Sequence, residues 1–97
     1  MELDLELKYV NFIRDKILAL IPDVEIYFFG SRTQGKALEY SDVDVALKSS
    51  DKIPIEKMLQ LKAQFEESTI PYKIDIVDLN NLKAEFKKII EKDLYKI

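Results

Sequence analysis

The chain has neither cysteine nor histidine among its 97 residues. The absence of cysteine excludes disulfides, thiolate nucleophiles and cysteine-type zinc sites, and it fits a reducing compartment. The absence of histidine leaves acid–base and metal chemistry to aspartate, glutamate, lysine or tyrosine. Carboxylates are therefore the first side chains to consider as functional groups.

An excess of basic charge and a long apolar run are also missing. Because 15 basic residues stand against 18 acidic ones, direct nucleic-acid binding is not expected. The acidic start, residues 1–4, has no apolar stretch behind a basic beginning, and no later run approaches membrane-spanning length. We therefore expect a cytoplasmic protein without membrane association. A composition of 47% hydrophobic and 34% charged residues predicts one folded domain over residues 1–97.

The spacing of apolar residues predicts alternating helices and strands. Steps of three and four residues indicate helices, whereas β-branched runs and strict alternation indicate strands, the first of them largely buried on both faces. The expected helices cover about residues 5–20, 55–65 and 82–93, and the expected strands cover residues 24–29, 42–47 and 72–79. This order predicts an α/β fold, a small mixed sheet flanked by helices, with a parallel crossover between the last two strands.

Two aspartates on the middle strand form the main candidate site. Asp42 and Asp44 are two residues apart, so on a strand their carboxylates project from one face about 7 Å apart. On a buried face such a pair needs protonation, a basic neighbour or a bound cation, and oxygen-only ligands favour Mg²⁺. Asp75 in the last strand could join them and hold two Mg²⁺ ions for displacement at a phosphate. The alternative without a functional role is that Asp42 and Asp44 lie on a strand face exposed to solvent.

A glycine-containing turn follows the first strand. Gly30 and Ser31 would present free backbone N–H groups to a phosphate. Arg32 and Lys36 in the same loop are candidates to counter the charge of a triphosphate. The loop also fits the G-x-x-x-x-G-K frame of a P-loop. That reading is disfavoured, because Ala37 follows the lysine and only five residues separate it from the next strand, too few for the helix of a P-loop.

These residues resemble a known signature. The run from Gly30-Ser31 to Asp42-Val43-Asp44 is similar to the G-S-x(10)-D-x-D motif of the minimal (MNT) branch of the polymerase β-like nucleotidyltransferase superfamily. The resemblance implies that Gly30 and Ser31 hold the nucleotide phosphates and that Asp42 and Asp44 bind both metals. It also implies that Asp75 is the metal ligand that activates the acceptor hydroxyl. Asp78, three residues later, is then expected to cap the strand end or the next helix.

The resemblance implies transfer of AMP from ATP to a hydroxyl with two Mg²⁺ ions. Because the scaffold uses nearly the whole chain, the acceptor site must come from a second subunit or a separate protein. Family members of this size are typically paired with a HEPN ribonuclease toxin, whose tyrosine they adenylylate as its antitoxin. Two alternatives remain, a non-catalytic module that neutralises a partner by contact and a small-molecule nucleotidyltransferase. The expected partner surface includes the ends of the first and last helices with Leu94, Tyr95 and Ile97.

Overall fold

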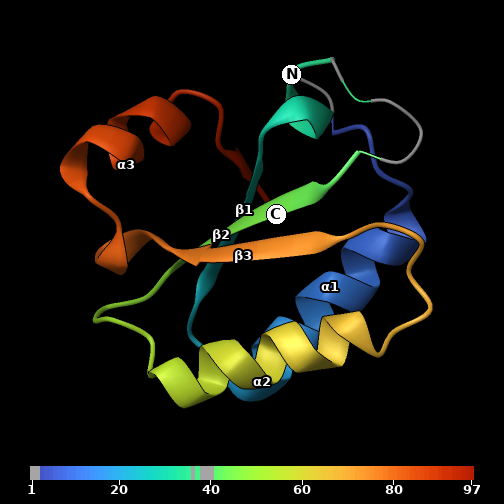
Figure 1. The fold of residues 1–97 in the computed structure, drawn as a ribbon, viewed down its shortest axis with the longest axis horizontal. Coiled ribbons are helices and arrows are strands. Elements are labelled where there is room, and N and C mark those ends of the chain that lie inside the picture. The colour runs from blue at the N-terminus through green and yellow to red at the C-terminus, as the bar shows by residue number, and fades with distance from the viewer. Residues whose placement is uncertain (1–2, 36, 38–40) are drawn as a thin grey trace.

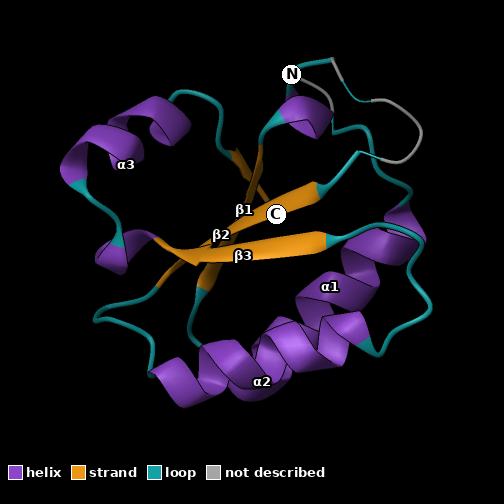
Figure 2. Ribbon diagram, viewed as in Figure 1, coloured by secondary structure: helices purple, strands orange, loops and turns teal. Residues whose placement is uncertain are grey.

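The computed structural model describes residues 3–35, 37 and 41–97, and it contains a mixed sheet flanked by helices (Figures 1 and 2). The α/β class and the small mixed sheet predicted from the sequence are confirmed. The elements are α1 (Leu7–Leu20), β1 (Glu25–Phe29), η1 (Ser31–Thr33), β2 (Val43–Lys48), α2 (Ile55–Glu66), β3 (Ile74–Asp78), η2 (Leu79–Asn81), α3 (Ala84–Glu91) and β4 (Tyr95–Lys96). Within these described residues, no helix is long and apolar enough to cross a membrane.

The four strands lie in the order β3-β2-β1-β4. β2 pairs antiparallel with β1 and parallel with β3, so the predicted parallel crossover through α2 is confirmed. Figure 1 shows α1 and α2 together on one side of the sheet, with α3 lying apart from them. The candidate residues Gly30, Asp44 and Asp75 belong to, or directly follow, the neighbouring strands β1, β2 and β3.

The main core lies between the sheet and the pair α1 and α2. Period-two alternation in β2 directs its valines and leucine to this side, where they meet the apolar stripe of α1. The fully buried side chains of this cluster include Ile13, Ile17, Val45, Leu47 and Leu61. The opposite face of the sheet is thus left to the polar residues of β2 and to the shorter α3.

The second face carries a smaller cluster. It is formed by Ala46, Leu79 and Ile90, with partly buried neighbours that include Tyr27 and Phe29. In β1 the burial alternates, because every second residue points to this thinly covered face. The expectation that β1 is buried on both faces is therefore wrong. The thin cover also explains why polar side chains on this face remain accessible.

The last strand, β4, was not predicted. Its residues Tyr95–Lys96 pair with Tyr27 and Phe28 of β1, and the Ile97 N–H donates to the Ile26 carbonyl at 3.1 Å.

Three apolar residues at this end, Leu94, Tyr95 and Ile97, are half-buried and pack against the two clusters. The expectation that these three side chains are exposed is wrong, because they pack against the clusters and Tyr95 pairs with β1, whereas Leu7 at the start of α1 is exposed. Among the described residues, the large apolar side chains that are exposed lie on the helices, at Leu7, Ile55, Leu59, Phe86 and Ile89.

Candidate active site

The three candidate aspartates lie at neighbouring positions of β2 and β3. Asp42 immediately precedes β2, Asp44 is the second residue of β2, and Asp75 is the second residue of β3. In the parallel register Asp44 is the direct partner of Asp75, and the Val43 N–H donates to the Lys73 carbonyl at 2.8 Å. Because both strands begin at the same end of the sheet, the three carboxylates belong to one local site, as the sequence predicted.

Negative charge accumulates at the centre of this site. Burial, and then the nearby charges of Asp75 and Asp42, raise the pKa of the Asp44 carboxyl above its ordinary value. A bound cation would relieve both causes, since it replaces lost solvation and cancels repulsion. The donor set consists of carboxylate oxygens alone, which suits Mg²⁺. The chemistry of the residues therefore fits the metal that the motif implies.

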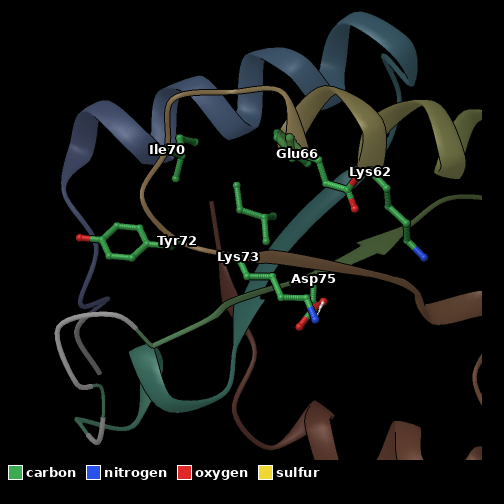
Figure 3. A pocket seen from close by; sticks show the side chains of 8 residues that line it. Lys62, Glu66, Ile70, Tyr72, Lys73 and Asp75 are labelled. Carbon is green, nitrogen blue, oxygen red and sulfur yellow. Dashed lines mark ion pairs between the residues drawn. The ribbon is translucent and has the colours of Figure 1, made fainter.

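The carboxylates are not yet arranged around an ion. Among the described residues, no group of three histidine, cysteine, aspartate or glutamate side chains is disposed to hold a metal. Asp75 Oδ1 instead lies 3.7 Å from Lys73 Nζ (Figure 3), and the Lys73 side chain is 72% exposed and that of Asp75 44% exposed. An exposed pair of this kind contributes little to stability, so Asp75 can exchange Lys73 for a cation at small cost.

Gly30 brings the turn after β1 against the Asp44 carboxylate. The antiparallel register pairs Phe29 with Asp44, which places the next residue, Gly30, beside that side chain. Its backbone has φ 83° and ψ −156°, a conformation open essentially only to glycine. A Cβ on Gly30 would also overlap Asp44 Oδ2. The glycine is therefore required both by its own backbone and by the close approach of a candidate metal ligand.

Ser31 opens a short 3₁₀ turn, Ser31–Thr33, directly after this glycine. The turn is held by the Thr33 N–H, which donates to the Gly30 carbonyl at 3.0 Å, and by the Gln34 N–H, which donates to the Ser31 carbonyl at 3.2 Å. Ser31 itself is half-buried, next to the site rather than inside the core. The turn thus lies where a phosphate beside the carboxylates could meet its first residues.

Arg32 does not lie where the sequence predicted, in a position to contact a triphosphate. Its side chain is buried, with 5% of the residue exposed. The guanidinium donates to the backbone carbonyls of Ser41 and Asp4, and it lies 4.1 Å from the centre of the Tyr72 ring. Arg32 therefore contacts the backbone and the aromatic ring of segments that surround the site. Lys36, the other cationic candidate, lies outside the described residues.

Two further residues of the turn, which sequence reasoning missed, connect it to the C-terminal end of α3. Thr33 Oγ1 lies 2.9 Å from the Gly30 carbonyl and 3.3 Å from the Asp93 carbonyl, and either oxygen can accept its proton. Gln34 Nε2 donates to Asp93 Oδ2 at 2.7 Å. Residues about sixty positions apart hold the turn in place, so no local sequence signal could have shown the contact.

A cavity of about 320 Å³ opens beside Asp75, between the outer edge of β3 and α2 (Figure 3). Its lining combines apolar and charged side chains, namely Lys62, Phe65, Glu66, Ile70, Tyr72, Lys73 and Ile74. This volume is at the small end of the range for ligand pockets.

Asp78 faces the other side of β3 and serves the fold. It pairs in register with Leu47 of the main core and is 7% exposed. Its carboxylate accepts the Ile53 N–H at 2.7 Å and the Asn80 N–H at 3.0 Å. The predicted capping role of Asp78 is confirmed, and the register leaves Asp75 as the aspartate of β3 that faces Asp44.

Removing these two carboxylates should have very different consequences for stability. We expect Asp78→Ala to lower the free energy of unfolding by about 2–4 kcal/mol, because two backbone N–H groups lose their acceptor. We expect Asp75→Ala to change it by less than about 0.5 kcal/mol, because its side chain makes an exposed ion pair. Urea unfolding of both variants measures the difference. Equal losses would contradict the separation of structural and functional roles.

Comparison with known proteins agrees with this geometry. The family model described as polymerase beta, nucleotidyltransferase, matches residues 15–96. A probable protein adenylyltransferase, MntA, of Haemophilus influenzae is 33% identical over 91 residues, which cover 94% of this chain and 80% of the relative.

Solved structures share the fold. A toxin–antitoxin crystal structure with AMP-PNP superposes with a TM-score of 0.76 at 25% identity, covering 89% of this chain and 69% of that one. An MNT antitoxin in complex with a tri-AMPylated HEPN toxin of Shewanella oneidensis superposes with a TM-score of 0.69 at 22% identity, covering 89% and 66%. On the family match, the identity with the relative and the shared fold, this chain belongs to the polymerase beta nucleotidyltransferase family.

Proposed function

We propose that this chain transfers AMP from ATP to a hydroxyl group of a partner protein, using two Mg²⁺ ions. The observation that carries this proposal is the meeting of three parts at one end of the sheet. Asp44 pairs in register with Asp75, and the backbone of Gly30 lies against the Asp44 carboxylate. A phosphate-binding turn beside paired carboxylates is the arrangement that metal-assisted nucleotidyl transfer requires.

Each residue then has a defined role. The N–H groups of the Gly30-Ser31 turn bind the phosphates of ATP. Asp42 and Asp44 would be ligands of both metal ions, and Asp75 would be a ligand of the ion that activates the acceptor hydroxyl. The ions, when bound, offset the charge that develops on the phosphates. The acceptor oxygen bonds to the α-phosphorus, the bond to pyrophosphate breaks, and the hydroxyl proton passes to water beside the partly exposed Asp75 carboxylate. In-line geometry places the acceptor on the Asp75 side of the site.

We further propose that the acceptor is a tyrosine of a HEPN-type toxin and that this chain is its antitoxin. The support is the similarity to MntA and to the fold of an MNT antitoxin bound to a tri-AMPylated HEPN toxin. The cavity of about 320 Å³ beside Asp75 has room for one aromatic side chain. Its partly apolar lining suits the ring of a tyrosine, whose hydroxyl would point toward the carboxylates.

The runner-up is a binding module that neutralises its partner by contact alone. The exposed apolar side chains of α2 and α3, among them Leu59 and Ile89, are suited to contact with another protein. A doubly substituted Asp42→Asn/Asp44→Asn variant separates the two functions. If this variant still neutralised the partner fully, contact would suffice and the catalytic proposal would fail.

The direct test is an incubation with Mg²⁺ and α-labelled ATP, with and without the protein encoded by the adjacent gene. We expect label on the partner, a mass increase by AMP units, and no label with Asp42→Asn. Asp51→Asn, which changes an exposed aspartate after β2, is the matched control and should retain transfer. Tight binding of the partner without transfer of label would favour the binding module.

A further inference from the structure

Arg32 is a buried cation at the junction of three chain segments. Nη1 donates to the Asp4 carbonyl at 2.8 Å, and Nε and Nη2 donate to the Ser41 carbonyl at 3.2 and 2.9 Å. One face of the guanidinium lies 4.1 Å from the centre of the Tyr72 ring. The Arg32 carbonyl also accepts the Asp4 N–H at 2.7 Å. A planar group with forked donors can meet all these partners together, whereas an ammonium cannot.

The contacted residues lead directly into the two carboxylate-bearing strands. Ser41 immediately precedes Asp42, and Tyr72 is followed by Lys73, whose carbonyl accepts the first N–H of β2. Arg32 itself belongs to the turn that begins at Gly30-Ser31. One side chain therefore sets the start of β2, the start of β3 and the phosphate-binding turn relative to one another.

We propose that Arg32 is a positioning residue for the metal site, acting through Ser41 and Tyr72 rather than by touching phosphate. The inference rests on the proposed Mg²⁺-dependent function. Asp42 lies outside the regular strand and is exposed, so the position of its carboxylate depends on the neighbouring Ser41 backbone, whose carbonyl Arg32 holds. Loss of the forked contact should leave the charge in place but loosen the spacing of Asp42 from Asp44 and Asp75. Outer groups that orient metal ligands commonly alter metal affinity about 10- to 100-fold.

The test is a titration with Mg²⁺ alone. The backbone amide NMR shifts of the aspartates report binding, and wild type, Arg32→Lys and Arg14→Lys are compared. Arg14 is the other arginine of the chain, and within the described residues it forms a partly exposed ion pair with its neighbour Asp15, so its substitution is the matched control. We expect half-saturation of Arg32→Lys to need about tenfold more Mg²⁺ than wild type. Arg14→Lys should stay within about twofold.

The outcomes distinguish the positioning role of Arg32 from the proposed Mg²⁺-dependent function. Because no nucleotide is present, a direct phosphate contact by Arg32 predicts an unchanged Mg²⁺ titration, and a merely structural role predicts lower thermal stability with an unchanged titration. Either result would overturn the positioning role. No response in wild type would overturn the proposed metal-dependent function as well.

If Arg32→Lys does not fold, Tyr72→Leu is tested in its place, because it removes the aromatic ring that stacks on Arg32 and keeps the hydrogen bonds of Arg32. We expect about a threefold weaker Mg²⁺ response from this variant. An unchanged response would contradict the inference.

Discussion

Substitution of Asp44 by asparagine is expected to reduce AMP transfer at least about a thousandfold, equivalent to about 4 kcal/mol of transition-state stabilisation. Asp44 is the central carboxylate, paired in register with Asp75 and flanked by Asp42. Asparagine keeps the size of the side chain but removes the charge that would hold a cation between the strands. Steady-state transfer of label from ATP measures the loss.

The control for this substitution is Asp15→Asn on α1, which removes the same charge from an exposed side chain. We expect it to leave transfer within about twofold, because surface substitutions rarely act beyond their neighbours. A substantial residual rate in Asp44→Asn would mean that Asp42 and Asp75 suffice. In that case the assignment of Asp44 as ligand to both metals would be wrong.

The same substitution should stabilise the metal-free protein at neutral pH. Burial and neighbouring carboxylates raise the pKa of Asp44, so the folded state holds its proton more tightly than the unfolded chain. This contribution to stability is fully present below the ordinary aspartate pKa of about 4 and is lost as the pH rises through the raised folded value. Asparagine cannot ionise and avoids the loss.

Thermal unfolding in EDTA across this range provides the measurement. The Tm of Asp44→Asn should match wild type near about pH 4 and exceed it near about pH 7. Added Mg²⁺ should then raise the Tm of wild type and leave that of the variant nearly unchanged. A constant difference at every pH would show that Asp44 does not titrate with a raised pKa.

Much of the fold follows from local patterns in the sequence. The alternation in β2 determines which residues enter the main core, and it also places Asp44 on the opposite face. The parallel crossover through α2 then brings Asp75 beside it. Asp78 could be assigned to the other face of β3 because three residues separate it from Asp75. Period and connectivity therefore place Asp75 and Asp78 on opposite faces, and the resemblance to the family was needed to choose Asp75 for the site.

The parts that could not be predicted depend on contacts between distant segments. β4 has two residues, too few for a periodic signal, and it forms because Tyr95 meets Phe28 of β1. A loop arginine such as Arg32 is ordinarily exposed, and its burial here requires a carbonyl from the N-terminal segment and the ring of Tyr72. Only the assembled structure brings these partners together.

Gly30→Ala is expected to abolish transfer and to destabilise the fold, with a loss of more than about 3 kcal/mol in the free energy of unfolding. Two causes add. The backbone conformation at Gly30 is strained for any residue with a Cβ, and that Cβ would overlap Asp44 Oδ2. Gly35→Ala provides the matched control, because Gly35 also has a positive φ, 70°, but no atom of the described residues lies within 4 Å of the added Cβ.

The control should lose only about 1 kcal/mol, the cost of a left-handed backbone. The excess loss in Gly30→Ala combines its more strained backbone with the clash against Asp44, and a double-mutant cycle can separate the two. In an Asp44→Ala background the carboxylate is gone, and the nearest remaining atom of residue 44, its Cβ, would be 3.5 Å from the new methyl group, an ordinary contact. Gly30→Ala should then cost little more than backbone strain, as measured by urea unfolding. An equal loss of unfolding free energy in the wild-type and Asp44→Ala backgrounds would show that the added methyl group does not clash with the carboxylate. Glycine would then be required at position 30 only by its backbone conformation.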